Sequence, residues 1–377
     1  MPNPKVQILL VSAQAAPNML PALDPSLKPA EAILLVTAKM ASRADALAAV
    51  LSEAHIKVTR VNLANEHDFS ALGDVMLDVA PGHAGDDIAL NVTGGTKLMA
   101  LAAQSVAQAA GWRVFYVDVD TDEVIWLGRE NQRKKLAAQL RLPHYLKGYG
   151  FQLAESIARP PAERRHNELL QTLISQVGSL EAPLGQLNYL AQEAETRKTL
   201  TIELTAEQQD SRGLEALLRN FAAADVLAVN GGTIKFASEV DRIFANGGWL
   251  EHHVYQTISN LHGELGLRDK AANLVVVDQT EVRNELDVAF LARNRLFIVE
   301  CKTARMDSAR ASKVNDTLFK LSEICRRVGG LGTRGMLASY RPLGDAEKKL
   351  ARALGIEIVA SGELTRLAER LKSWVNG

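Results

Sequence analysis

The N-terminal part of the chain, up to about residue 148, alternates short apolar runs with alanine-rich stretches, and this alternation strongly constrains the fold. The apolar runs are hydrophobic on both faces, and stretches of helical composition such as 42–55 and 97–110 separate several of them. Strands that are buried on both faces and separated by helices indicate a parallel sheet covered on both sides. We therefore predict a Rossmann-like, doubly wound α/β domain over residues 1–148, with 123–128 as a final antiparallel strand. The predicted parallel strands are 6–12, 32–38, 57–63, 87–93 and 113–120.

Residues 149–240 follow a different pattern, in which amphipathic helices precede a strand, a glycine turn and a second strand. The turn is Asn230-Gly231-Gly232, and helices that end in such a hairpin resemble a winged helix-turn-helix. One interpretation is DNA binding through the wing. The other, which we favour, is a packing or dimerisation spacer, because Lys235 is the only cation of the wing.

Residues 241–377 predict an α+β domain. It opens with a helix and continues into three strands, a helix, a glycine-rich turn, a further strand and a helical tail. The three strands are predicted near 273–278, 285–292 and 295–302.

Composition narrows the class of protein. The chain has 377 residues, which favours two or three domains over one. Its net charge of −1 lacks the overall basic character of many nucleic-acid binders, although local patches matter more for partner choice. The two cysteines, Cys301 and Cys325, have no metal-type spacing and fit a reducing cytoplasm. No run approaches the roughly 18 apolar residues of a membrane span, so we predict a soluble cytoplasmic protein without a membrane partner.

Four ionisable side chains interrupt two apolar, strand-like runs in the stretch NELDVAFLARNRLFIVECKT, residues 284–303. Residues two apart in a strand share a face, so Glu285 and Asp287 lie together on the first strand, as do Glu300 and Lys302 on the second. A solvated face of a half-exposed hairpin is the simpler interpretation, and it accounts for Glu285. It accounts less well for three acids and a lysine bounded by Phe-Ile-Val.

A turn centred on Arg293 and Asn294 sets the register of this hairpin, whereas a three-residue loop would shift it by one. With the two-residue turn, Asp287 lies opposite Glu300, with Cβ atoms about 4.5–5.5 Å apart. Two acids at this separation repel unless a cation lies between them. A divalent metal with oxygen ligands suits that place, and a nearby lysine can orient or activate a water. Glu251, on the predicted helix WLEHHVY, is placed to add a ligand or base.

A second candidate site lies between the predicted strand 87–93 and the helix that follows it. Glycines there let backbone N–H groups approach a phosphate, the helix N-terminus favours anions, and a lysine adds charge. The sequence is neither a Walker A motif nor GxGxxG, so an NTPase is not predicted. A capped helix with a tight turn accounts for the first threonine and glycine alone, and we therefore favour a nucleotide or phosphate site. The residues of this loop are Thr93, Gly94, Gly95, Thr96 and Lys97, and other loops at the same sheet edge offer Ser12, Gln14, Thr37 and Lys39.

The order of the C-terminal acids resembles the PD-(D/E)xK nuclease signature. Asp287 precedes Glu300-Cys301-Lys302, Glu251 stands in the place of the helical acid, and Leu286 replaces the usual proline. The resemblance implies a Mg²⁺- or Mn²⁺-dependent phosphodiesterase, with Asp287 and Glu300 as ligands and Lys302 positioning the attacking water. It also implies Glu251 as a further metal ligand, and Glu251 and Glu285 as further catalytic residues.

Taken together, the chain resembles the CRISPR-associated Rossmann fold (CARF) nucleases over essentially its whole length. The resemblance implies an N-terminal CARF domain at 1–148, a winged-helix-like segment at 149–240 and a restriction-endonuclease-like α/β domain at 241–377. It implies a homodimer that binds a cyclic oligoadenylate, with the tetramer expected, through Ser12 and Thr93 to Lys97. Binding would activate non-specific cleavage of single-stranded DNA, RNA or both in type III CRISPR antiviral defence.

Two other functions fit parts of the pattern. A ligand-responsive transcription regulator would combine the sensor with the winged helix and a decayed C-terminal domain, but the intact Asp287, Glu300 and Lys302 argue against decay. A restriction or repair nuclease would use the N-terminal domain only as structure, and the Thr93–Lys97 loop argues against that.

Overall fold

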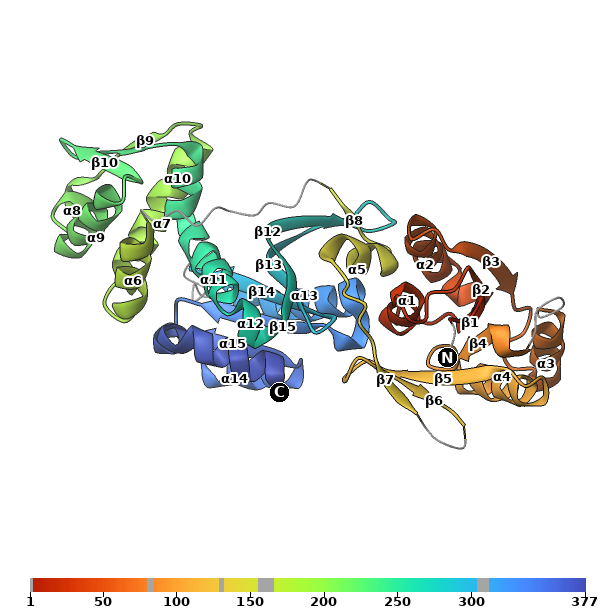
Figure 1. The fold of residues 1–377 in the computed structure, drawn as a ribbon. Coiled ribbons are helices and arrows are strands. Elements are labelled where there is room, and N and C mark those ends of the chain that lie inside the picture. Colours follow the sequence, from red (N-terminus) through yellow and green to blue (C-terminus); the bar gives the residue numbers. More distant parts are fainter. Residues whose placement is uncertain (1–2, 80–84, 129–131, 155–165, 304–311) are drawn as a thin grey trace.

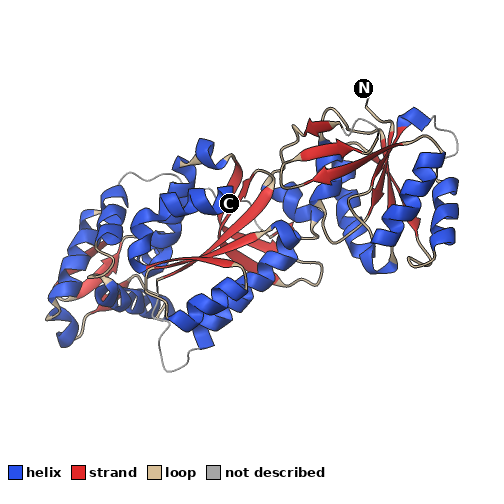
Figure 2. Ribbon diagram, turned by 90° about the horizontal axis from the view of Figure 1, so that it is seen from below, coloured by secondary structure: helices blue, strands red, loops and turns tan. Residues whose placement is uncertain are grey.

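The computed structural model describes residues 3–79, 85–128, 132–154, 166–303 and 312–377 in three parts (Figures 1 and 2). The N-terminal α/β part lies at one end of the molecule, and the part formed by residues 166–243 lies at the other end. The C-terminal part lies between them. The middle segment of the sequence therefore does not lie between the two larger parts in space. No helix in the described ranges is long and apolar enough to cross a bilayer.

The N-terminal sheet confirms the predicted doubly wound fold. Its order is β3-β2-β1-β4-β5-β6-β7, with parallel pairing from β3 to β5 and antiparallel pairing from β5 to β7. The chain order reverses between β1 and β4, which is where ligands bind in sheets of this type. The strands are β1 (Val6–Leu10), β2 (Glu31–Val36), β3 (Lys57–Asn62), β4 (Ile88–Asn91), β5 (Arg113–Asp118), β6 (Glu123–Trp126) and β7 (Arg133–Lys135).

Helices bury both faces of this sheet, as the two-sided apolar strands required. Leu9 of β1 packs in a core with helices α1 and α2, while its neighbours Ile8 and Leu10 pack in another core with α3 and α4. Strand β7 was not predicted, because the segment Arg-Lys-Lys is exposed and carries no apolar signal. The helices are α1 (Ala16–Leu23), α2 (Ala41–Glu53), α3 (Phe69–Asp78) and α4 (Lys97–Ala109), and α5 (Leu142–Gly148) follows the sheet.

The middle part has the helices and wing hairpin of a winged-helix-like module. Its three-stranded sheet has the order β10-β11-β9, and Asn230 pairs with Thr233 across a turn whose glycines, Gly231 and Gly232, both have positive φ. The strands are β9 (Thr201–Glu203), β10 (Leu227–Asn230) and β11 (Thr233–Phe236), and the helices are α6 (Asn167–Ser175), α7 (Glu181–Thr196), α8 (Ala206–Gln209) and α9 (Arg212–Ala223).

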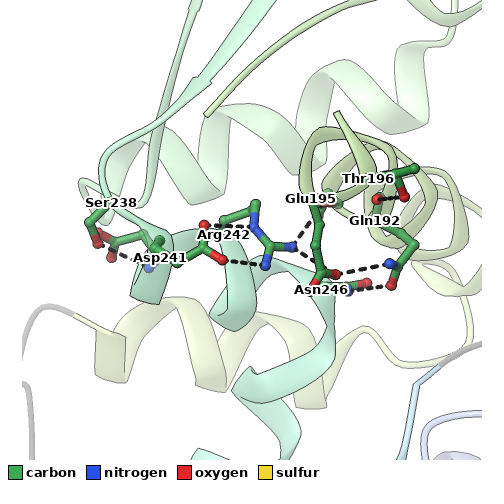
Figure 3. Close-up of polar contacts among 9 residues, drawn as sticks. Gln192, Glu195, Thr196, Ser238, Asp241, Arg242 and Asn246 are labelled. Carbon is green, nitrogen blue, oxygen red and sulfur yellow. Dashed lines mark hydrogen bonds and ion pairs between the residues drawn. The ribbon is translucent and has the colours of Figure 1, made fainter. Parts of the chain in front are cut away.

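A buried arginine holds α7 to α10 (Glu239–Ile243), the helix at the end of the middle part that leads into the C-terminal part. Arg242, on α10, is 1% exposed, and its guanidinium lies 2.6 Å from Glu239 and 3.4 Å from Glu195 (Figure 3). The same guanidinium donates to the Ala191 carbonyl of α7 at 3.0 Å. Two acids and a carbonyl compensate this buried charge, so the α7–α10 contact is held in one geometry.

The C-terminal part is a mixed six-stranded sheet with helices on both faces. Its order is β16-β15-β14-β13-β12-β8, antiparallel from β8 to β14 and parallel from β14 to β16. Helices α11 and α15 pack on one face, and α13 and α14 pack on the other. The strands are β8 (Gln152–Leu153), β12 (Leu267–Val277), β13 (Arg283–Ala292), β14 (Arg295–Lys302), β15 (Arg334–Ser339) and β16 (Ile356–Ala360). The helices are α11 (Trp249–Asn260), α12 (His262–Leu265), α13 (Ser312–Gly329), α14 (Asp345–Ala353) and α15 (Leu367–Asn376).

Strand β12 begins at Leu267, six residues before the predicted start near 273. The charged run of Arg268, Asp269 and Lys270 conceals the strand in the sequence. Asp269 is nevertheless buried, because its carboxylate accepts the Leu142 N–H at 3.0 Å.

Candidate active site

The β13–β14 hairpin has the predicted turn and register. Arg293 and Asn294 have φ of 50° and 57°, and Ala292 pairs with Arg295, which defines a two-residue hairpin turn. The pairing continues in this register as far as Val288 and Val299.

Beyond that pair the strands part, and an ionic cluster lies in the gap. The Asp287 carboxylate accepts the Cys301 N–H at 2.7 Å. Lys302 Nζ lies 2.6 Å from Glu300 Oε1 and 3.8 Å from Asp287 Oδ2. The side chains of Asp287, Glu300 and Lys302 are 15%, 23% and 34% exposed, so the cluster is accessible from solvent without being freely hydrated.

Glu251 joins this cluster through a kink in the helix that carries it. Between α10 and α11 the chain makes a π-turn at Phe244–Gly248, in which Gly247 has a φ of 110°. A Cβ at Gly247 would lie 2.3 Å from Thr303 Oγ1, so the approach of this turn to the end of β14 requires glycine. The kink therefore brings the first turn of α11, with Glu251, toward the residues that follow Lys302.

The pKa values of the cluster show an excess of negative charge. Burial, followed by repulsion from Asp287, raises the pKa of Glu251 to about 8. Burial, followed by repulsion from Glu300, raises the pKa of Asp287 to about 7. Burial opposes the charged form of Lys302, but Asp287 and Glu300 outweigh it and raise the pKa of this ammonium.

Glu285 contributes to the electrostatic field of the cluster. Its charge helps to raise the pKa of both Glu251 and Asp287. It also lines a groove of about 760 Å³ that Glu300 and Lys302 line as well. Helix α13 forms the opposite wall of this groove, with Phe319 and Lys320 among its exposed residues.

The predicted three-ligand metal set is not assembled in the described part of the chain. No three Asp, Glu, His or Cys side chains converge there closely enough to hold a metal ion. Lys302 supplies the positive charge between Asp287 and Glu300 that the register argument assigned to a metal. The donor set still suits a hard divalent cation, because the four acids whose charges interact here, Glu251, Glu285, Asp287 and Glu300, offer carboxylate oxygens.

In the N-terminal part, the loop after β4 owes most of its residues to backbone geometry. Thr96 caps α4 by accepting the Met99 N–H at 3.2 Å. Gly94 is required because a Cβ there would lie 2.1 Å from the Leu10 carbonyl oxygen, and Gly95 has a φ of 72°. A capped helix with a tight turn therefore explains Gly94, Gly95 and Thr96, which is more of this loop than the sequence suggested. Lys97, the first residue of α4, is exposed.

Buried asparagines that the sequence analysis missed hold this loop to the sheet. Thr93 donates to Asn91 Oδ1 at 2.6 Å and accepts the Val117 N–H at 2.7 Å. Asn91 in turn donates to Asn18 Oδ1 at 3.0 Å, and both asparagines are buried. The sequence feature that could have predicted this network is the polar Asn91 at the end of the otherwise apolar run Ile-Ala-Leu-Asn.

A cavity of about 290 Å³ brings three of the predicted ligand residues together. Ser12, Gln14 and Thr93 line it at the carboxyl edge of the sheet. Lys39 lies apart, exposed and 3.5 Å from Glu66. Residues from the C-terminal part line the same cavity, and they include Asn294 and Arg295 at the tip of the hairpin that carries the ionic cluster.

Direct bonds join that hairpin tip to the N-terminal part. Arg295 lies 2.5 Å from Asp120, which follows β5. Asn294 accepts the Leu140 N–H at 3.0 Å and donates to the Ala138 carbonyl at 3.2 Å. The two candidate sites are therefore connected through one strand pair.

Comparison with protein families matches both ends of the chain. Residues 6–145 match the model described as the Card1 CARF domain, and residues 238–377 match the Card1-like endonuclease domain. Together the two models cover more than half of the chain. The protein belongs to the Card1-like CARF endonucleases.

Two solved structures match this chain over nearly its full length, and a third shares the fold over part of its own length. Protein VC1899 from Vibrio cholerae is 27% identical, with a TM-score of 0.89 over 98% of each chain. Can2 from Sulfobacillus thermosulfidooxidans, solved in complex with cyclic tetra-adenylate, is 25% identical, with a TM-score of 0.83 over 99% of each chain. A type III CRISPR defence DNA nuclease activated by cyclic oligoadenylate shares the fold at 21% identity and a TM-score of 0.54, covering 91% of this chain and 46% of that one. A comparison with curated protein sequences found no significant match.

The family assigns the two sites to the two domains. Ser12, Gln14 and Thr93, which line one wall of the cavity, lie in the CARF domain, and the Asp287–Glu300–Lys302 cluster lies in the endonuclease domain, which cleaves nucleic acid with the help of a divalent metal. The prediction of a CARF nuclease is confirmed.

Proposed function

We propose that this protein is a nuclease activated by a cyclic oligoadenylate, most simply cyclic tetra-adenylate, that cleaves single-stranded DNA, RNA or both without sequence preference. The observation that carries the proposal is the cluster of Asp287, Glu300 and Lys302, set in a hairpin whose tip contacts the CARF domain. The similarity to Can2, solved with cyclic tetra-adenylate, supports the choice of ligand. We further propose a cytoplasmic homodimer with domains at 1–148, 149–240 and 241–377.

Asp287 and Glu300 are the residues we propose to hold Mg²⁺ or Mn²⁺, with Glu251 as a further ligand. When bound, the metal would polarise the scissile phosphate and stabilise the charge that develops on its oxygens. Lys302 keeps its proton because Asp287 and Glu300 raise its pKa. Its ammonium therefore orients the attacking water and neutralises phosphate charge rather than acting as a general base. Without a cation, the pKa of about 8 lets Glu251 carry a proton that relieves repulsion from Asp287.

In the CARF domain, the proposed ligand site combines the cavity with the start of α4. Backbone N–H groups at the N-terminus of α4 and the exposed Lys97 suit the phosphates of the ligand. The remaining proposed contacts come from Ser12, Gln14, Lys39, Thr93, Gly94, Gly95 and Thr96. A ring-shaped ligand shared by two copies of this edge accounts for the proposed homodimer.

Activation requires the ligand to favour one arrangement of the endonuclease domain over another. Thr93 is bonded to Val117, and three residues later Asp120 is bonded to Arg295. We propose this path as the route by which ligand binding reaches the β13–β14 hairpin.

The test uses purified protein with Mn²⁺ and labelled single-stranded DNA or RNA, with and without cyclic tetra-adenylate, beside a Glu300→Ala variant. Ligand-dependent cleavage that is lost in the variant is expected. Cleavage that ignores the ligand would overturn the sensor role of the CARF domain. Sequence-specific duplex binding without any cleavage would instead favour a transcription regulator.

A further inference from the structure

Asn273 of β12 and Asp287 of β13 occupy opposite positions where the strand pair is irregular. Ala272 pairs with Val288 and Leu274 pairs with Leu286, so the register places Asn273 across from Asp287. Asn273 has a φ of 49°, in the left-handed region. Among the described residues it is the only one with positive φ inside a β-strand.

Both strands change face at these two positions. In a regular strand, residues two apart share a face. Ala272 and Val288 belong to the core under α11, whereas Leu274 and Leu286 belong to the core under α13. Regular alternation, which the sequence analysis assumed for this strand, would put Leu286 and Val288 on one face, so that assumption is wrong at Asp287. Each strand switches faces within a single residue, and the register is kept because both switch together.

The switch determines where the Asp287 carboxylate lies. Regular alternation would place it on the face of Ala289, toward α13. Backbone N–H groups of a strand lie in the plane of the sheet, so the 2.7 Å bond from Cys301 N–H shows that the carboxylate lies between β13 and β14. There Asp287 Oδ2 lies 3.8 Å from Lys302 Nζ, and the Asp287 carboxylate interacts electrostatically with Glu251.

We propose that Asn273 is a positioning residue for Asp287, whose left-handed backbone imposes this switch and turns the carboxylate toward Cys301 and Lys302. The Asn273 side chain is exposed, so packing does not explain its identity. Asparagine tolerates the left-handed region far better than most residues, glycine tolerates it freely, and a β-branched residue does not. The proposal gives Asp287 the role assigned under the proposed function, but the geometry it predicts is measurable without any cleavage.

The two cysteines of the chain allow a direct measurement of this geometry. Selective ¹⁵N-cysteine labelling of the full-length protein yields two backbone amide signals, from Cys301 at the Asp287 carboxylate and Cys325 on α13. Asp287→Ala identifies the Cys301 signal and shows how it moves when the bond is lost. Asn273→Val is expected to move the Cys301 signal in the same direction and leave Cys325 in place, whereas Asn273→Gly leaves both in place.

Activity and metal binding give the second readout. Asn273→Val is expected to lower kcat for single-stranded substrate by about 10- to 100-fold, with a smaller change in KM, because misplacing a reacting group by about 1 Å has costs of that size. Mn²⁺ binding, measured by calorimetry without substrate, is expected to weaken in parallel. Asn273→Gly is expected to restore both.

Asp225→Val is the matched control, because Asp225 is exposed, has a φ of 59° and lies in the middle part. It carries the same backbone strain, so a similar fall in melting temperature with unchanged kcat is expected. If Asn273→Val keeps the Cys301 signal, or if Asn273→Gly loses as much kcat as Asn273→Val, the proposal is overturned. A parent protein that cleaves nothing, with the Cys301 shifts as expected, would refute the proposed function alone.

Discussion

The CARF loop and the endonuclease hairpin place their candidate residues in opposite ways. In the loop, Thr93 and Thr96 follow the end of a regular strand, and neutral hydrogen bonds fix both side chains. Thr93 is bonded to Asn91 and Val117, and Thr96 is bonded to Met99. In the hairpin, Asp287 lies inside a strand that must break its own alternation, among charges that repel one another. Local hydrogen bonds stabilise the loop site. The residues of the hairpin site repel one another, so the surrounding fold must keep them together.

If this contrast is correct, removing the hairpin lysine has the largest effect on function. Lys302→Ala is expected to lower kcat by about 10²- to 10³-fold, the usual cost of removing one group that stabilises developing charge. The measurement is ligand-activated cleavage of single-stranded substrate under single-turnover conditions. Lys320→Ala is the matched control, because Lys320 lines the same groove from α13 without belonging to the cluster. An equal loss in both variants would mean that the groove needs only general positive charge.

Damage to the loop is expected to appear first as lost stability. Gly94→Ala would bring a Cβ within 2.1 Å of the Leu10 carbonyl oxygen, a backbone atom that cannot easily move. Overpacking of this kind costs about 1–3 kcal/mol, and binding of cyclic tetra-adenylate should fall as well. Thermal unfolding and calorimetric titration measure the two effects. Gly128→Ala is the control, since a Cβ there meets nothing within 4 Å.

A substitution in the ionic cluster is expected to have the opposite effect and to raise the stability of the protein. Burial and Asp287 raise the pKa of Glu251 from 4.5 to about 8, so the folded metal-free protein holds a proton that the unfolded chain has already released. Stability from this group is present at low pH and is lost as pH rises toward 8. Glu251→Gln is therefore expected to raise the melting temperature in EDTA by a few degrees at pH 8.5 and by less at pH 5.5.

Saturating Mn²⁺ should shrink that gain, because a bound cation removes the repulsion that the substitution relieves. Glu323→Gln, at an exposed position of α13, should leave the melting temperature nearly unchanged at both pH values. A gain for Glu251→Gln that is the same at both pH values would show that repulsion is not its source.

The smallest expected effect concerns the ion pair that joins the hairpin tip to the CARF domain. Arg295→Ala removes the 2.5 Å ion pair with Asp120, which is 79% exposed. Pairs this accessible contribute about 0.2–1 kcal/mol, so the ratio of cleavage with and without cyclic tetra-adenylate should fall by only about 1.5- to 5-fold. Arg133→Ala, which removes an exposed pair with Glu123 inside the CARF domain, should leave the ratio unchanged. An unchanged ratio in Arg295→Ala would exclude this ion pair from the activation route.

Local patterns in the chain predicted much of this molecule. Two-sided apolar strands predicted the parallel sheet, and the Arg293-Asn294 turn predicted the register as far as Val288 and Val299. Strand β12 was predicted too short because the buried Asp269 looks like a surface residue until its partner, the Leu142 N–H, is known. The asparagine network under the loop was missed for the same reason, since Asn18 and Asn91 are 73 residues apart.

The sequence by itself determined the domain classes, the hairpin and the identity of the charged residues, because each follows from short-range periodicity and turn chemistry. Only the tertiary structure decided how those charges meet. The kink at Gly247 brings Glu251 from one helix, the switch at Asn273 turns Asp287 into the gap, and Lys302 occupies the place first assigned to a metal. These outcomes depend on which face of a strand packs against which helix, and that is settled by contacts between residues far apart in the chain.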